Sequence, residues 1–219
     1  APASSALGTV ANWITTTDHK KIGRLFVGAS ALWMLVIVGV GIALGIERIA
    51  PDTAIFNSNS VTQLFAMLRT GATFGVLLPL ALGFGIAVVP TQVGSKSLSF
   101  ARLAMFGFYA WLIGSGLVIG SIIANGGPSG GNAQMVDLYL MGVGVGVVGV
   151  IAASVSLLTT VLTSRQTGLS LLEIPMFSWS VFVAAISIVL TLPVLLGSLI
   201  YSALGLVIES ALGGLFTKQ

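Results

Sequence analysis

The sequence of 219 residues contains no cysteine and a single histidine, His19. Without cysteine the chain can form no disulfide, iron–sulfur cluster or thiolate ligand. Proteins hold haem iron and copper mainly through histidine, methionine, cysteine or tyrosine. One histidine therefore leaves few ways to build a redox centre within this chain.

Charge is also scarce, since charged residues make up 7% of the chain and apolar residues 56%. Such a composition cannot build a soluble surface and is typical of integral membrane proteins. The net charge is +3, but the nine basic residues are scattered among apolar segments and form no basic patch. We therefore expect no nucleic-acid partner.

No charged linker or long polar segment divides the chain, so we predict one transmembrane domain over residues 1–219. Residues 1–12 have no basic start and no apolar core, and we expect no cleavable signal peptide.

Long uncharged segments fill most of the sequence. Each is long enough to cross about 30 Å of hydrocarbon at about 1.5 Å per residue. We expect Pro193 to kink the last segment, and a tight reversal of the chain at residues 192–196 is the alternative. We expect the part beyond Gly205 to lie in the outer interface of the membrane. The sequence predicts an all-α polytopic membrane protein, a bundle of about five transmembrane helices, at about residues 25–46, 64–89, 101–124, 136–162 and 174–204.

The positions of lysine and arginine predict the orientation of these helices, because basic residues favour the cytoplasmic side. A cytoplasmic N-terminus places most of them at inner helix ends. These inner residues are Lys20, Lys21, Arg24, Lys96, Arg102 and Arg165, against Arg48 and Lys218 on the outer face.

Glycines spaced four apart predict close helix packing. The pairs are Gly41 with Gly45, Gly71 with Gly75, Gly116 with Gly120 and Gly142 with Gly146. Residues 144–149 also match the G-x-G-x-x-G pattern, but that pattern binds dinucleotides only after a β-strand, and here it lies inside a membrane helix. We expect no nucleotide site.

Several motifs, in order and at nearly constant spacing, resemble subunit I of the haem-copper cytochrome c oxidases. They are residues 13–23, Leu64 to Met67, Gly83-Phe84, Pro90 with Gln92 and Gly94, Asp137-Leu138, residues 174–181 and residues 192–195. The resemblance covers residues 13 to about 200 and corresponds to the first five of that subunit's roughly twelve helices.

The departures from the family pattern concern its chemistry. The resemblance implies that a histidine binding the low-spin haem would follow Met67, where this sequence has Leu68 and then Arg69. It implies an aspartate at the mouth of a proton channel where Ser97 stands, and channel asparagines where Ile86 and Ala104 stand. An alkyl side chain can neither ligate haem nor relay a proton.

These losses imply a chain with no catalytic, cofactor-binding or metal-binding residue of its own. We expect a non-catalytic accessory subunit of an aerobic respiratory cytochrome c oxidase in the plasma (inner) membrane of a bacterium, an actinobacterial supercomplex being one setting. Its expected partners are the catalytic subunits, which carry haem a and copper, the cytochrome bc complex and phospholipid. The alternatives are an N-terminal fragment of a split subunit I and a small membrane transporter.

Three residues are candidates for contact with lipid or a partner, namely Arg69, His19 and Trp13. Arg69 lies within the second helix, where we expect it to snorkel, to pair with Glu47 or Asp52, or to contact a lipid phosphate or a partner's carboxylate. His19 and Trp13 are expected at the inner interface. Glu173 is expected to begin the fifth helix, where a carboxylate complements the helix dipole.

Overall fold

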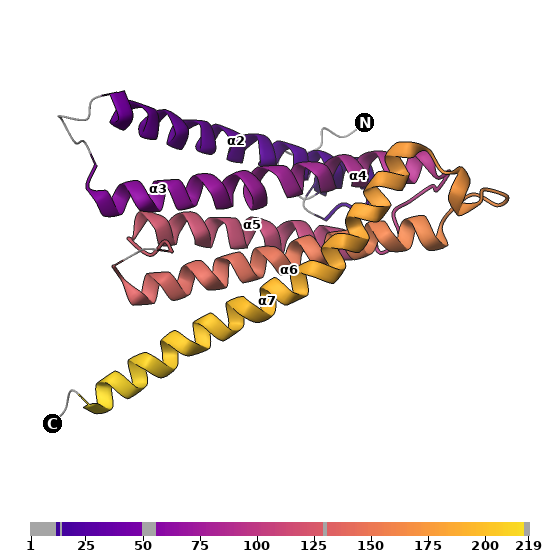
Figure 1. Ribbon diagram of the computed structural model, residues 1–219. Coiled ribbons are helices and arrows are strands. Elements are labelled where there is room, and N and C mark those ends of the chain that lie inside the picture. The colour runs from indigo at the N-terminus through magenta and orange to yellow at the C-terminus, as the bar shows by residue number, and fades with distance from the viewer. Residues whose placement is uncertain (1–11, 14, 50–55, 129–130, 217–219) are drawn as a thin grey trace.

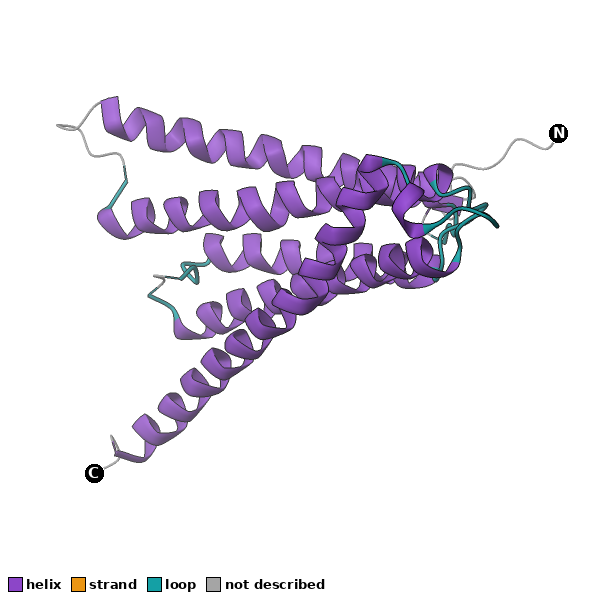
Figure 2. Ribbon diagram, turned by 45° about the vertical axis from the view of Figure 1, so that its right-hand side comes forward, coloured by secondary structure: helices purple, strands orange, loops and turns teal. Residues whose placement is uncertain are grey.

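The computed structural model of the chain describes residues 12–13, 15–49, 56–128 and 131–216. In these residues every regular element is helical, and five helices are long and apolar enough to span a membrane (Figures 1 and 2). The elements are α2 (His19–Ile49), α3 (Ser58–Thr70), the π-helix η1 (Gly71–Leu77), α4 (Leu78–Gln92), α5 (Ala101–Ile123), α6 (Ala133–Thr163), the 3-10 turn η2 (Leu171–Glu173) and α7 (Met176–Phe216). The chain is a multi-pass membrane protein, as predicted.

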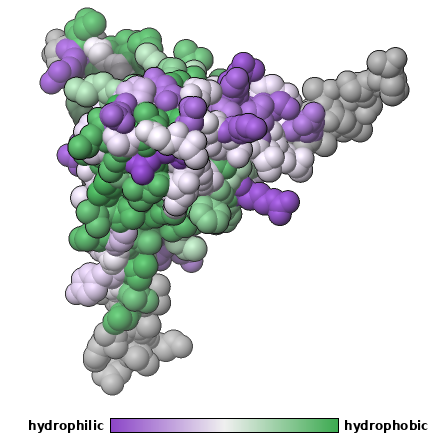
Figure 3. All heavy atoms as spheres, turned by 90° about the vertical axis from the view of Figure 1, so that its right-hand side faces the viewer, coloured by the Kyte–Doolittle hydropathy of each residue, from purple (hydrophilic) through white to green (hydrophobic). Residues whose placement is uncertain are grey.

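The spans run up and down, with α3, η1 and α4 forming one continuous span (Figure 1). We call the end that holds the start of α2 and the loops 93–100 and 164–175 the inner end, following the predicted orientation, and the opposite end the outer end. Figure 3 looks onto the inner end and shows hydrophilic residues gathered there, with apolar residues along the flank below them.

Most helices are longer than the uncharged segments that predicted them. The first starts at His19 instead of residue 25, because charged side chains are tolerated where a helix leaves the hydrocarbon. The second and fourth start early at asparagine caps. The Asn57 side chain accepts a hydrogen bond from the Ser60 amide at 2.8 Å, and the Asn132 side chain accepts one from the Met135 amide at 3.4 Å.

The last helix, α7, continues through Pro193 to Phe216, so the alternative of a reversal at residues 192–196 is wrong. The membrane-spanning part of α7 ends at Gly205, close to the predicted end near residue 204, and the helix itself continues beyond it. Figure 1 shows α7 changing direction along its length and diverging from α6 toward the C-terminal end. The placement of the part beyond Gly205 at the outer interface stays a prediction.

Backbone contact between α5 and α6 forms the tightest interface in the described bundle. A Cβ atom added at Gly114 would lie 2.5 Å from the Gly142 carbonyl oxygen and from the Gly146 amide nitrogen. Similarly, one added at Gly107 would lie 2.6 Å from the Gly149 carbonyl oxygen. Helices in a membrane associate largely by such packing, because lipid chains are as apolar as the helices are.

The predicted glycine pairs fall into two groups. Gly71 and Gly75 meet the Trp33 ring of α2. Gly142 meets Gly114, and the backbone of Gly146 also lies against Gly114, although a Cβ atom added at Gly146 itself would have nothing within 4 Å. These two pairs do mark close packing. The other two pairs do not. Nothing lies within 4 Å of a Cβ atom added at Gly45, Gly116 or Gly120, and one added at Gly41 would make only an ordinary contact with Leu68, at 3.9 Å.

Aromatic rings fill the centre beside this interface. The Phe26 and Phe108 ring centroids lie 5.1 Å apart, edge to face, and the Phe26 and Trp111 centroids lie 6.0 Å apart. Trp111 is only 2% exposed, and Trp33 is also buried, so both are packing residues and not interfacial anchors.

Gly114→Ala should lower the free energy of unfolding by about 1–3 kcal/mol, because the new methyl group collides with backbone atoms that cannot move aside. Reversible unfolding of the purified chain in mixed micelles with increasing dodecyl sulfate measures this. Gly116→Ala, on the same helix but in open space, is the matched control and should unfold at the same denaturant concentration or slightly higher. If both variants unfolded at the same dodecyl sulfate content, the close contact between α5 and α6 at Gly114 would be contradicted.

Candidate functional site

The second span leaves α-helical geometry at η1, directly after the segment that carries Leu68 and Arg69. In this π-helical stretch the Leu78 amide donates to the Thr73 carbonyl, five residues earlier. Pro79 follows, and it lacks an amide hydrogen and would crowd the Gly75 carbonyl in a regular helix. The wider turn thus lies where the sequence disfavours an α-helix.

Two side-chain hydrogen bonds fix this irregular stretch to the rest of the bundle. Trp111 on α5 donates its indole Nε1–H to the Phe74 carbonyl oxygen at 2.8 Å. The Thr70 and Tyr139 hydroxyl oxygens lie 3.1 Å apart, which links α3 to α6. Sequence reasoning missed η1 and both bonds, although Gly71, Gly75 and Pro79 together signal a departure from regular helix.

Leu68 occupies the position at which the family resemblance implies a haem ligand. Its side chain is partly buried and faces α2 near Gly41, at which an added Cβ atom would lie 3.9 Å from the Leu68 Cδ1 atom. Leucine has no nitrogen, oxygen or sulfur atom that could ligate iron, and the neighbouring Met67 is packed into the hydrophobic core. The residues present do not fit an axially ligated haem at this position.

Arg69 is exposed on α3. It lies 11 residues after Ser58, which corresponds to about 16 Å along the helix. No ion pair of Arg69 is seen among the described residues, and Asp52 lies outside them, so the partner of Arg69 stays a prediction. The exposed side chain is directed at the surroundings of the bundle.

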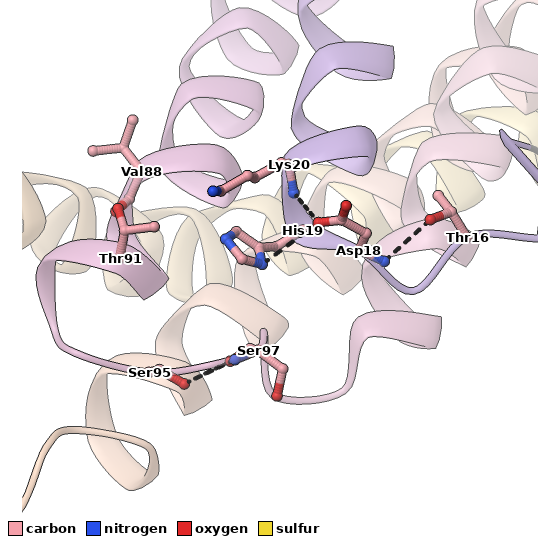
Figure 4. A network of polar contacts seen from close by, with 8 residues as sticks. All are labelled: Thr16, Asp18, His19, Lys20, Val88, Thr91, Ser95 and Ser97. Carbon is pink, nitrogen blue, oxygen red and sulfur yellow. Dashed lines mark hydrogen bonds and ion pairs between the residues drawn. The ribbon is translucent and has the colours of Figure 1, made fainter.

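A second polar group lies at the inner end, around His19 (Figure 4). The Asp18 carboxylate accepts from the Lys20 amide at 2.9 Å, and the Asp18 amide donates to the Thr16 hydroxyl at 3.1 Å. The His19 ring is 8% exposed, with Nδ1 3.8 Å from an Asp18 oxygen and Nε2 without a hydrogen-bond partner among the described residues. Figure 4 shows the ring above the loop that carries Ser95 and Ser97.

The predicted contact residues are thus not brought together. His19 lies at the start of α2, at the inner end, and is 8% exposed, so its contact with lipid or a partner stays a prediction. Trp13 lies before α2 and is partly exposed. Arg69 lies on the outer half of the second span, away from both.

Ser97 contributes only local contacts at the inner end. Its carbonyl accepts from the Ser95 hydroxyl at 2.6 Å. Ile86 on α4 and Ala104 on α5 are fully buried, so alkyl groups stand at both positions where the resemblance implies channel asparagines. Ser95, Ser97, Ile86 and Ala104 therefore form no continuous row of polar side chains from the loop into the bundle.

Hydroxyl groups instead fasten the inner loops to α6. The Ser99 amide donates to the Thr160 hydroxyl at 2.9 Å, the Ser99 and Ser164 hydroxyl oxygens lie 2.6 Å apart, and the Ser156 hydroxyl donates to the Ser99 carbonyl at 2.5 Å. Between α4 and α7, the Ser178 hydroxyl donates to the Gln92 side-chain oxygen at 2.6 Å. These bonds join distant parts of the chain and have no local sequence signal.

Glu173 does not begin the last helix, contrary to the prediction. It ends the 3-10 turn η2 in a capping box, in which the Ser170 amide donates to the Glu173 carboxylate at 3.1 Å. Ile174 before Pro175 is extended, as residues before proline usually are, and α7 starts at Met176.

Comparison with known proteins gives consistent matches. A family model described as "Cytochrome C and Quinol oxidase polypeptide I" matches residues 21–216. A cytochrome c oxidase subunit 1 of Corynebacterium diphtheriae is 29% identical over 230 residues, covering 98% of this chain and 40% of that protein.

Two further relatives extend the range of matches. A putative cytochrome c oxidase subunit 1-beta of Streptomyces avermitilis is 29% identical, covering 87% of this chain and 36% of that protein. A quinol oxidase subunit 1 of Bacillus subtilis is 28% identical, covering 84% of this chain and 30% of that protein. The chain therefore spans less than half the length of these curated relatives.

Hydrogen bonds from the Ser170 backbone amide and then from its hydroxyl hold the pKa of Glu173 below its ordinary value of 4.5. The capping box should therefore stabilise the loop fully above pH 4.5 and be lost as the pH falls through the lowered pKa. Ser170→Ala removes the hydroxyl bond and should shift the pKa of Glu173 upward, toward 4.5. Carbon-13 NMR titration of the Glu173 carboxyl measures this, with Ser180→Ala on α7 as the control. A wild-type pKa at or above 4.5 would contradict the capping box.

Proposed function

Because this chain belongs to the family of cytochrome c and quinol oxidase polypeptide I, we propose that it is a non-catalytic accessory subunit of an aerobic respiratory oxidase. It is a multi-pass membrane protein related to the N-terminal part of oxidase subunit I. Its proposed task in the oxidase is to stabilise the assembled complex through helix packing and lipid contacts.

The observation that carries the proposal is Leu68. The family resemblance implies a haem-binding histidine there, and the leucine offers iron no donor atom. The proposal is further supported by the buried alkyl groups of Ile86 and Ala104, which can take up or release no proton. The haem ligand and the proton channel that the resemblance implies are thus altered at separate places in the chain. Both changes favour a chain that carries out no catalytic step itself.

The retained features concern packing. Gly107 and Gly114 bring α5 against α6, and Trp111 fastens the second span. The first and last spans expose much apolar surface, with Leu35 69% and Val194 74% exposed. A rigid bundle with apolar outer spans suits contact with other membrane subunits or lipid.

The proposed neighbours are the catalytic subunits of a cytochrome c oxidase, which would hold haem a and copper, together with a cytochrome bc complex in a supercomplex. The matched relatives named above are bacterial, which favours the inner membrane of a bacterium as the location.

The second candidate function is an N-terminal fragment of a split subunit I, completed by another chain. The partial coverage of the relatives, 40% for the corynebacterial protein, favours it. Leu68 opposes it, because a completed subunit would still lack this haem ligand. A separate chain in the same membrane that supplies only the remaining helices would favour the fragment, whereas a full-length subunit I with intact histidines would favour the accessory subunit.

Purification through a tag on this chain, from native membranes in mild detergent, tests the proposal. Peptide mass spectrometry should recover oxidase subunits in constant ratio to the chain, and the reduced-minus-oxidised spectrum should show haem a. Deleting the chain should reduce the yield or thermal stability of the complex more than its turnover per haem. A colourless chain recovered alone, or the reverse pattern on deletion, would refute the accessory role.

Arg69→Leu should weaken recovery of the oxidase subunits. The substitution removes the exposed guanidinium of α3, and with it the proposed contact with an acidic group of a neighbouring subunit or of a lipid. Arg24→Leu, which removes an exposed arginine at the inner end of α2, is the matched control. The ratio of oxidase to tagged chain after a salt wash is the measurement. Unchanged assembly and activity in Arg69→Leu would remove Arg69 from the proposed contact.

A further inference from the structure

A small cavity lies in the middle of the bundle, where η1 faces α5 and α6. Its volume is about 30 Å³, which holds one or two water molecules and is far too small for a haem, a quinone or an acyl chain. Thr70 of α3 and the glycines of η1 line it on the second span, and Trp33 of α2 lies beside them. The lining residues of α5 share one helix face and are Trp111, Gly114, Ser115 and Val118.

Ser115 brings a free hydroxyl group to this cavity. The residue is only 9% exposed, lines the cavity and forms no hydrogen bond with any described residue. Other buried serines bond to a carbonyl of their own helix, as Ser121 does to Val118 at 2.9 Å and Ser154 to Val150 at 2.8 Å. Because a buried hydroxyl group without a partner is costly, the position of Ser115 favours a ligand that can form hydrogen bonds.

The second span brings a further hydroxyl group to the same cavity. The Thr70 hydroxyl oxygen lies 3.1 Å from that of Tyr139, and either group can be the donor. The pair uses one of its two hydroxyl hydrogens for this bond, so the other hydrogen can be donated elsewhere. Thr70 lines the cavity, and its hydroxyl can therefore serve a ligand there.

The backbone of η1 adds an acceptor. In an α-helix the Gly75 carbonyl would accept from the amide of residue 79, but Pro79 has no amide hydrogen. The neighbouring Phe74 carbonyl also loses its α-helical donor, because the Leu78 amide bonds to Thr73 instead, and there the Trp111 indole takes the donor's place. Gly75 lines the cavity, where a small ligand could do the same for its carbonyl.

These polar groups distinguish water from an apolar or a charged ligand. Dry cavities, which take up xenon, are lined by apolar groups, whereas a buried water needs about two to four polar partners. Two hydroxyl groups and a backbone carbonyl without its α-helical donor border this cavity. A bare ion would lack a counter-charge, because no charged residue stands among the described lining residues.

We propose that this cavity binds one ordered water molecule, which donates to the Gly75 carbonyl and bonds to the hydroxyl groups of Ser115 and Thr70. The water then supports the widened turn η1 from α5, next to the bond from Trp111 to Phe74. This inference is independent of the complex that the chain joins.

NMR cross-relaxation between water and amide protons tests the proposal, in the full perdeuterated chain with protonated amides in deuterated micelles. In wild type the amides of Gly75 and Gly146, both lining residues, should show cross-peaks to water. The amide of Val150, which is fully buried on α6 away from the cavity, should show none. Xenon under pressure should leave the Gly75 and Gly146 signals in place, because water already fills the site.

Ser115→Val replaces the hydroxyl group by methyl groups and should abolish the cross-peaks at Gly75 and Gly146. Ser121→Ala is the matched control, since it removes a hydroxyl group that bonds locally on the same helix, and should keep them. Ser115→Ala should also weaken them and serves if circular dichroism shows that Ser115→Val does not fold.

Three results would overturn the proposal. Missing cross-peaks in wild type, or xenon-induced shifts at Gly75 and Gly146, would show that the cavity is dry. Cross-peaks at Val150 as strong as those at Gly75 would show general entry of water and no specific site. Cross-peaks of equal intensity in wild type, Ser115→Val and Ser115→Ala would remove Ser115 from the site.

Discussion

Backbone amides and carbonyls in hydrocarbon have no water to bond, so each must find a partner within the protein. This constraint explains why the described spans are helices and why their one π-helical stretch is supported from outside. Around Pro79 the second span widens, and Trp111 donates to the Phe74 carbonyl from the neighbouring helix. The same indole packs against Phe26, so one residue both satisfies the backbone and fills the centre.

Glycine contacts then decide which helices lie closest together. Gly107 and Gly114 let α5 and α6 meet backbone to backbone, while α7 diverges from them toward the outer end. A tight central pair with a diverging last helix leaves broad apolar flanks. The features that bear on function are therefore outer surfaces, in a family whose larger members are named as oxidase subunits.

Much of the candidate site could be predicted from the sequence, because it depends on which residue occupies one position. Leu68 in place of an expected histidine is visible without coordinates, and so are Ser97, Ile86 and Ala104. The place of Glu173 was predicted wrongly, because whether a carboxylate caps a short turn or starts a helix depends on where Pro175 forces the chain to extend. The burial of His19 also has no local signal in the sequence, because it depends on the loops that cover the ring.

The sequence by itself determined the number and order of the spans, because uncharged length and hydropathy act locally along each helix. It also determined that position 68 carries no ligand atom. Only the tertiary structure decided which glycines pack, since Gly116 and Gly120 have the same spacing as Gly71 and Gly75, yet the first pair lies in open space and the second faces the Trp33 ring. It likewise decided the bonds from Ser99 to Thr160 and from Trp111 to Phe74, because such contacts depend on how whole helices rotate and cross, which no short stretch of sequence specifies.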